Sequence, residues 1–123
     1  MKIISRSVND TLKIGKVIAK NLRKADIVCL FGELGCGKTV LTKGIASALG
    51  IKRRKVISPS FVLIRQYSTA KIPLYHFDLY RLKTIEEILA LGYEEYFYDD
   101  GITVVEWADR LKYLLPKEYL KIK

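Results

Sequence analysis

The stretch FGELGCGKT, at residues 31–39, constrains the fold more than any other part of the sequence. It contains the pattern G-x-x-x-x-G-K-T in full. An apolar run, Ile27–Phe31, leads into it, and a segment with helical character, Thr39–Leu49, follows it and ends at Gly50. Glycines in such a loop let successive backbone N–H groups hold an anion, and the following helix adds the positive end of its dipole. The stretch therefore predicts a strand, a phosphate-holding loop and a helix, in that order.

Further apolar runs predict more strands of the same sheet. A continuous run such as Ile27–Phe31 is typical of a buried parallel strand. Val62–Tyr67 and Leu74–Phe77 predict a hairpin, and Ile102–Val105 predicts a last core strand. We therefore expect an α/β fold with a mostly parallel sheet, flanking helices and an antiparallel edge.

Three further helical segments are predicted along the chain. Asn9 or Asp10 is expected to cap a helix whose apolar face includes Leu12, Ile14, Val17, Ile18 and Leu22. Another helix opens over Thr84–Glu87, with Thr84 or a neighbour as its cap and acids in its first turn, and ends at Gly92. A short helix is predicted over Ala108–Leu115.

Length and composition set broad limits. The chain has 123 residues, which suits one small domain, and its 50% hydrophobic and 28% charged residues are typical of a soluble globular protein. The apolar runs are too short to cross a membrane, and the N-terminus has no apolar segment of signal-peptide length, so no membrane association and a cytoplasmic location are expected.

The net charge of +9 is unevenly distributed. Residues 1–71 hold 15 Lys and Arg against 3 Asp and Glu, whereas residues 72–123 hold 7 against 10. The basic run Lys52–Lys55 is either a surface for phosphate-rich partners or a solvated patch.

The two cysteines form no metal-binding pattern. Cys29 lies in an apolar run and is expected in the core. Cys36 lies inside the phosphate loop, where a helix N-terminus and a lysine would lower a thiol pKa. Whether Cys36 is reactive or only occupies a tolerant loop position stays open.

Two acidic residues directly follow apolar runs and are candidates for the metal side of a nucleotide site. Asp78 follows Leu74–Phe77, and Glu106 follows Ile102–Val105. Because ligands of open α/β sheets bind at the carboxyl ends of the strands, both carboxylates are expected near the phosphates. Each also has a plainer interpretation: Glu106 as a solvated acid at a strand end, and Asp78 as the partner of Arg81 across one helical turn.

The single histidine and the single tryptophan lie beside these acids. His76 alternates with Tyr75 and Phe77 in a strand pattern, which favours a hydrogen-bonded structural role over that of a base. Trp107 follows Glu106 and either lines the site or fills a core position.

Five motifs together resemble the TsaE family, also called YjeE. In chain order they are GELGCGKT, SPSF, YHFDLYRL, LGYEEYF and VVEWADR, and the similarity covers nearly the whole chain. The phosphate loop alone is generic, whereas its combination with YHFDLYRL and the Glu106–Trp107 pair is specific. The resemblance implies a single-domain P-loop NTPase, a small bacterial ATPase required to make threonylcarbamoyladenosine in tRNA.

The resemblance also implies a role for each matching residue. Lys38 would contact the phosphates of ATP or ADP, Thr39 and Glu106 would hold Mg²⁺, and Asp78 would orient water or act as a base. Lys38, Asp78 and Glu106 are therefore the predicted catalytic residues. The predicted nucleotide-binding residues are Gly32, Glu33, Leu34, Gly35, Cys36, Gly37, Lys38, Thr39, Val40 and Trp107.

Partners are implied in the same way. Members of the family work with TsaD and TsaB, the pair that transfers the threonylcarbamoyl group, and reach tRNA through that complex. TsaE is thought to bind the pair and to reset it between turnovers by hydrolysing ATP. An ATPase that is weak alone and stimulated by its partners is therefore expected.

The sequence departs from the family pattern at a few positions. Relatives often have Ala where Cys36 stands, Thr or Ser where Val40 stands, and Thr where Ser60 stands within the switch-like loop Ser58–Phe61. Relatives also continue with further strands after the position of Lys123. We expect one P-loop ATPase domain over residues 1–123 without that C-terminal strand region; whether the chain is naturally short, truncated or partly reported stays open.

Two other classes of function stay open at this point. A small nucleoside or small-molecule kinase would share the phosphate loop, but the chain has no arginine-rich lid segment and little length for an acceptor pocket. A nucleic-acid-binding module would use Lys52–Lys55, but no aromatic stacking motif accompanies that run.

Overall fold

The order of elements in the computed structural model is that of an α/β domain. The structure describes residues 7–31, 35–51, 64–67, 72–97 and 99–122. The elements are α1 (Val8–Lys20), β1 (Ile27–Leu30), α2 (Gly35–Ala48), β2 (Ile64–Tyr67), β3 (Leu74–Asp78), α3 (Ile85–Leu89), α4 (Glu94–Phe97), β4 (Ile102–Glu106), the 3₁₀ helix η2 (Ala108–Leu114) and β5 (Leu120–Ile122). Within these ranges, no helix has both the length and the apolarity needed to cross a membrane.

The described strands form one sheet in the order β2-β3-β4-β1-β5. Neighbours from β3 to β5 pair in parallel, whereas β2 pairs with β3 in the antiparallel direction. The predicted mostly parallel sheet with an antiparallel edge is therefore confirmed. The order also shows that β4 lies between β1 and β3, so strands far apart in the sequence become neighbours.

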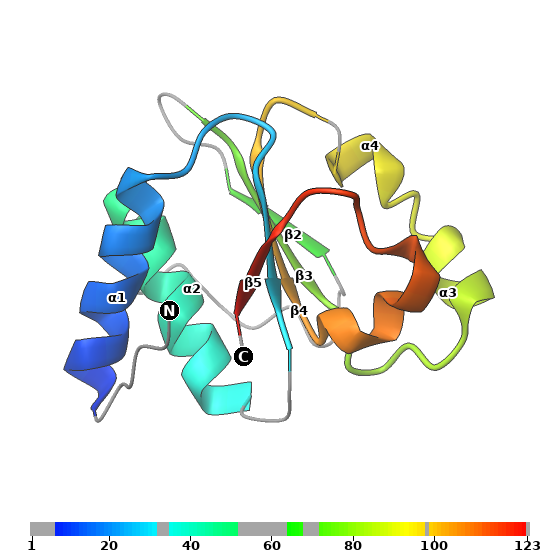
Figure 1. Ribbon diagram of the computed structural model, residues 1–123, viewed down its shortest axis with the longest axis horizontal. Coiled ribbons are helices and arrows are strands. Elements are labelled where there is room, and N and C mark those ends of the chain that lie inside the picture. Colours follow the sequence, from blue (N-terminus) through cyan, green and yellow to red (C-terminus); the bar gives the residue numbers. More distant parts are fainter. Residues whose placement is uncertain (1–6, 32–34, 52–63, 68–71, 98, 123) are drawn as a thin grey trace.

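Helices cover both faces of this sheet (Figure 1). On one face, α1 and α2 pack against alternate strand residues, namely Val28, Leu30, Leu74, Ile102 and Val104. On the other face, α3, α4 and η2 cover the intervening residues, namely Ile27, Cys29, Tyr75, Phe77 and Val105. This alternation follows from the pleat of a strand, in which successive side chains point to opposite faces.

The helices α1 and α2 cross at a pair of glycines. A Cβ atom on Gly15 would lie 2.7 Å from the backbone oxygen of Leu41 and 2.9 Å from the Cα of Gly44. A Cβ atom on Gly44 would lie 2.6 Å from the backbone oxygen of Leu12. Contact between the two backbones therefore sets the distance between the helices.

The start and the apolar face of α1 differ from the prediction. The cap is Ser7, whose side-chain oxygen accepts a hydrogen bond from the Asp10 backbone N–H, and not Asn9 or Asp10. Ser7 has extended backbone angles, and its short hydroxyl reaches the third helical residue, as a serine cap does. Val17 was expected in the apolar face but is 58% exposed, because it lies outside the stripe that faces α2 and the sheet.

The next two helices also have boundaries that periodicity did not predict. The helix α2 begins at Gly35, four residues before the predicted Thr39, because the first turn forms within the glycine loop itself. The predicted cap of α3, Thr84, is confirmed and forms a full capping box. That helix ends at Leu89, and Gly92 lies in the following turn with φ of +69°.

The glycine crossing generates a prediction about stability. Gly15→Ala should lower the free energy of unfolding by about 1–3 kcal/mol, because the new methyl group clashes with backbone atoms that cannot turn away. An alanine normally stabilises a helix interior by about 1 kcal/mol relative to glycine, so the sign of the change is informative. Urea unfolding measures the effect, with Lys16→Ala on the exposed side of α1 as a control. A Gly15→Ala protein more stable than wild type would contradict the backbone contact.

A tyrosine–aspartate hydrogen bond on the opposite face generates a prediction about pH. The Tyr75 hydroxyl donates to the Asp99 carboxylate, and this bond, followed by burial, raises the pKa of Tyr75 to about 12. Since the pKa of an unfolded tyrosine is about 10, the stabilisation is complete below pH 10 and is lost as the pH rises through 12. As the pH rises from 10 to 12, the free energy of unfolding of Tyr75→Phe should therefore fall less than that of wild type. Tyr113→Phe, at a 78% exposed position, should behave like wild type. Equal losses in all three proteins would contradict the bond.

Candidate functional site

Two carboxylates end neighbouring parallel strands at one edge of the sheet. Asp78 is the last residue of β3, Glu106 is the last residue of β4, and the strand register pairs them directly. Glu106 also pairs with Leu30, the last residue of β1. Only 5% of Asp78 and 3% of Glu106 is exposed, so the interpretation of Glu106 as a solvated acid is wrong.

Both carboxylates lie on the face of the sheet that α2 covers. Along β4, alternation puts Glu106 on the same face as Val104, which packs in the core formed with α1 and α2. Along β3, alternation puts Asp78 on the same face as Leu74, which belongs to that core as well. The strand pleat therefore turns both acids toward the layer that contains α2.

The helix α2 begins beside this edge. β1 ends at Leu30 and α2 begins at Gly35, and these two ends lie at the same end of the molecule (Figure 1). The first turn of a helix carries backbone N–H groups without helical partners and the positive end of the helix dipole. Backbone N–H groups without helical partners therefore begin at Gly35, five residues after Leu30, the end of the strand that pairs with Glu106.

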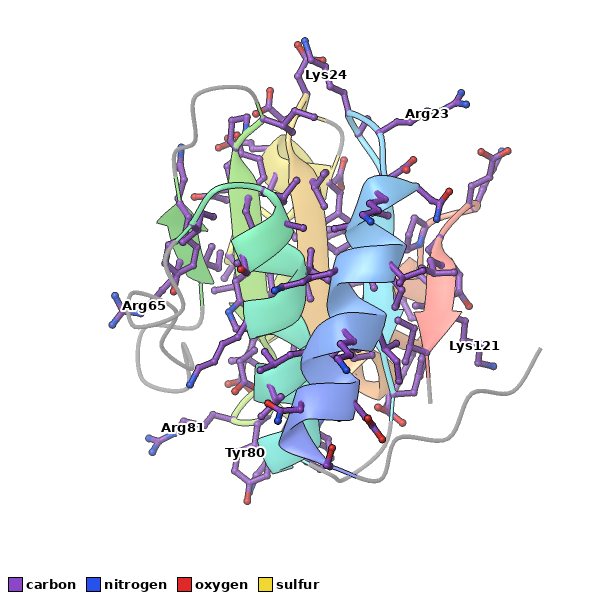
Figure 2. All side chains as sticks on the ribbon, turned by 90° about the vertical axis from the view of Figure 1, so that its left-hand side faces the viewer. Arg23, Lys24, Arg65, Tyr80, Arg81 and Lys121 are labelled. Carbon is purple, nitrogen blue, oxygen red and sulfur yellow. The ribbon has the colours of Figure 1, made fainter. Side chains whose placement is uncertain are left out.

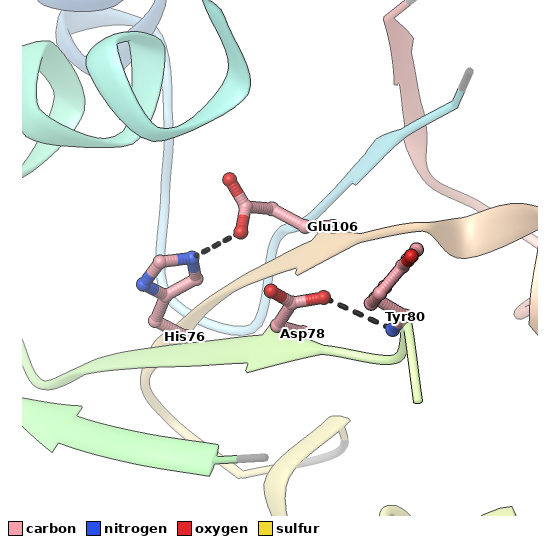
Figure 3. A network of polar contacts seen from close by, with 4 residues as sticks. All are labelled: His76, Asp78, Tyr80 and Glu106. Carbon is pink, nitrogen blue, oxygen red and sulfur yellow. Dashed lines mark hydrogen bonds and ion pairs between the residues drawn. The ribbon is translucent and has the colours of Figure 1, made fainter. Parts of the chain in front are cut away.

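His76 lies in β3 and contacts Glu106, and the sequence analysis did not include it in the site. Its Nε2 atom is 3.3 Å from Oε2 of Glu106, and its side chain is fully buried (Figure 3). Apart from this ion-pair contact, neither ring nitrogen meets the geometry of a hydrogen bond within the described residues, so the predicted hydrogen-bonded structural role stays a prediction. A signal was present in the sequence: His76 and Asp78 are two residues apart in one strand and therefore share a face.

Backbone hydrogen bonds hold Asp78 and the end of β4 together. Oδ1 of Asp78 accepts a hydrogen bond of 3.0 Å from the backbone N–H of Tyr80 (Figure 3). The backbone N–H of Leu79 donates a 3.2 Å hydrogen bond to the backbone oxygen of Glu106. The segment that leaves β3 therefore fixes the Asp78 carboxylate and is itself anchored to the residue that bears the second one.

Trp107 follows Glu106 and is held by an aromatic and cationic cluster. Its ring packs against Tyr80 at 5.0 Å between centroids, and the Arg110 guanidinium lies 5.3 Å from the ring centre. Tyr80 is 53% exposed and projects from the end of the molecule (Figure 2). Trp107 has φ of +59°, a conformation that a bulky residue rarely adopts and that is enriched at functional sites. The contacts with Tyr80 and Arg110 therefore hold the Trp107 ring in place directly after Glu106, and its role in lining the site stays a prediction.

A family model matches almost the whole chain. The family described as Threonylcarbamoyl adenosine biosynthesis protein TsaE matches residues 5–123. The chain belongs to the TsaE family.

Individual relatives agree with this assignment. The tRNA threonylcarbamoyladenosine biosynthesis protein TsaE of Bacillus subtilis (strain 168) is 44% identical over 119 residues, which are 95% of this chain and 73% of that protein. The protein of the same name from Treponema pallidum (strain Nichols) is 38% identical over 117 residues, 95% of this chain and 85% of that protein. The crystal structure of Bacillus subtilis YdiB matches with a TM-score of 0.79 and 38% identity, over 95% of this chain and 70% of that chain. The predicted P-loop α/β fold is confirmed.

The donor set of the site suits the Mg²⁺ that a TsaE protein with a P-loop implies. Within the described residues, no group of three or more His, Cys, Asp or Glu could enclose a metal ion. Mg²⁺ does not need such a cage, since it is usually bound by one or two carboxylates, water and nucleotide phosphates. The buried Asp78 and Glu106 at the strand ends therefore fit this ion better than a metal that takes a full set of protein ligands.

Several predicted site residues lie outside what the structure describes. These are the loop residues Gly32, Glu33 and Leu34, the side chains at positions 35–39, which include Cys36, Lys38 and Thr39, and the segments Ser58–Phe61 and Lys52–Lys55. Val40, in α2, is half-buried. Cys29 lies in the core as predicted, where burial raises the pKa of its thiol to about 12 and leaves it unreactive.

Proposed function

We propose that this chain is an ATP-hydrolysing component of the machinery that makes threonylcarbamoyladenosine in tRNA. The observation that carries the proposal is the pair Asp78 and Glu106, buried in register on the face that α2 covers. A phosphate loop can bind a nucleotide without such a pair, whereas hydrolysis also needs a metal-side carboxylate and a group that orients the attacking water. The pathway comes from the names of the TsaE relatives.

The proposed cofactor is Mg²⁺ with ATP or ADP. Thr39 and Glu106 are the residues proposed to hold the metal, and the backbone of Gly32–Val40 is proposed to surround the phosphates, with Lys38 on the β- and γ-phosphates. When bound, the ion neutralises charge that develops on the phosphates during transfer. Glu106 suits this role because its carboxylate lies at the end of the strand next to β1, which leads into the phosphate loop.

Asp78 is proposed to orient the attacking water or to accept its proton. The hydrogen bond from the Tyr80 N–H fixes one oxygen of its carboxylate, and a fixed carboxylate can align a nucleophile without first losing side-chain freedom. Trp107 is proposed to form one wall of the nucleotide site, because Tyr80 and Arg110 hold its ring beside Glu106.

The proposed partners are TsaD and TsaB, with tRNA reached through their complex. We propose that hydrolysis is slow in the isolated protein, faster in the complex, and resets the partner pair between turnovers. Membership of the TsaE family supports this role. We further propose that residues 1–123 act as one P-loop ATPase domain in the cytoplasm, where tRNA is modified.

Two isosteric substitutions test the division of roles between the carboxylates. Glu106→Gln should raise the Kd for Mg-nucleotide at least about tenfold, because it removes a charged ligand of the metal. Asp78→Asn should leave that Kd within about threefold but lower kcat by about 10²–10³, as expected when a group that handles the water is lost. Calorimetry and phosphate release measure the two properties, and Glu118→Gln, at an exposed position, is the control. Equal effects of the two site substitutions on both properties would show that the roles are not divided in this way.

The reset mechanism is tested in the presence of TsaB and TsaD. ATP turnover should rise when the partners are added, and Lys38→Ala should abolish both turnover and repeated rounds of tRNA modification while the first round remains. The amount of threonylcarbamoyladenosine formed per partner complex measures the number of rounds. If Lys38→Ala supports repeated rounds at the wild-type rate, hydrolysis does not reset the pair. Transfer of the γ-phosphate to a nucleoside in place of its release would instead indicate a kinase.

A further inference from the structure

The imidazole of His76 occupies an unusual place for a polar group. It lies in the middle of β3, fully buried, and apart from an ion-pair contact with Glu106 neither ring nitrogen meets the geometry of a hydrogen bond among the described residues. A buried donor or acceptor left without a partner costs about 1–3 kcal/mol. An apolar side chain at this position would avoid that cost, since Leu74 and Val104 on the same face pack in the core with α2. The chain therefore keeps a polar ring where packing alone would favour an apolar one.

The ring is close to one atom of the site in particular. Nε2 of His76 is 3.3 Å from Oε2 of Glu106, and the other carboxylate oxygen of Glu106 points away from the ring (Figure 3). The register explains this contact: His76 pairs with Val104, two residues before Glu106, so the Glu106 side chain leans back along the sheet toward the ring. His76 thus contacts the Glu106 carboxylate from the neighbouring strand β3, on the same face of the sheet.

We propose that His76 is the positioning residue of Glu106. Its Nε2–H holds one carboxylate oxygen and thereby fixes the orientation in which the other oxygen is offered to Mg²⁺. The inference rests on the proposed function, in which Glu106 is a metal ligand. Groups that hydrogen-bond to a metal-ligating carboxylate typically contribute a factor of about 10–100 to metal affinity.

The contact explains why the ring is tolerated in the core. Rigid strands on both sides fix the backbones of His76 and Glu106, so a short interaction between their side chains orients the carboxylate with little freedom left. A residue with a structural role only would contribute to folding, and its loss would not change the Mg²⁺ requirement selectively. This difference separates the two roles by experiment.

Three variants test the proposal. His76→Leu removes the donor, whereas His76→Gln keeps an amide nitrogen at about the reach of Nε2. Thr103→Val is the matched control, because Thr103 is a fully buried polar residue of the neighbouring strand whose hydroxyl donates to the Tyr96 backbone oxygen on the opposite face. For each protein we would measure the Mg²⁺ concentration that gives half-maximal binding of a non-hydrolysable ATP analogue, the affinity for that analogue in EDTA, and the stability to urea without ligand.

The expected result is selective. His76→Leu should raise the Mg²⁺ requirement about 10–100-fold and leave binding in EDTA unchanged, while His76→Gln stays within about threefold of wild type. Thr103→Val should change stability alone. If His76→Leu does not fold, His76→Asn, whose amide is too short to reach the carboxylate, should show the same Mg²⁺ defect.

Two outcomes would overturn the proposal, and they differ. An unchanged Mg²⁺ requirement in His76→Leu or His76→Asn, in a site whose wild type needs Mg²⁺, would make His76 a structural residue only and leave the proposed function intact. A wild-type protein that binds the analogue equally well with and without Mg²⁺ would overturn the proposed function and, with it, the role of His76.

Discussion

The parallel pairing of β1, β4 and β3 is the constraint on which the site depends. Its register aligns Leu30, Glu106 and Asp78, the last residues of the three strands, at one edge of the sheet. A slip of one residue in β3 or β4 would turn its carboxylate to the opposite face, because side chains alternate along a strand. Backbone hydrogen bonding, and not contact between the acids, therefore aligns the two carboxylates with the end of β1. From that end the chain passes to α2.

The apolar packing on both faces supports this polar edge. Three polar side chains, His76, Asp78 and Glu106, lie almost fully buried in β3 and β4, which is unfavourable without compensation. Core residues on either side of the sheet provide that compensation, and the contact between Gly15 and Gly44 brings α1 and α2 close together. Packing in the rest of the fold thus compensates for the strained backbone of Trp107 and for the buried polar cluster at the ends of β3 and β4. Such compensation is common at functional sites.

Local sequence patterns predicted strands β1 to β4 and the candidate acids, because apolar runs and the residues that follow them can be read directly. Sequence could not predict that β4 lies between β1 and β3, since that order depends on contacts between distant segments. For the same reason the approach of His76 to Glu106 was missed. The cap at Ser7 and the start of α2 at Gly35 were missed because several nearby residues or turns satisfy the same local pattern, and tertiary packing selects among them.

The most direct test of the account is the position of a metal ion in the nucleotide complex. A crystal structure with Mn²⁺ in place of Mg²⁺ and a non-hydrolysable ATP analogue would locate the ion by its anomalous scattering. The account predicts a single peak at the edge where β1, β3 and β4 end, at about 2 Å from an oxygen of Glu106, with the phosphates at the start of α2. A metal bound away from Glu106, or phosphates bound away from the start of α2, would contradict it.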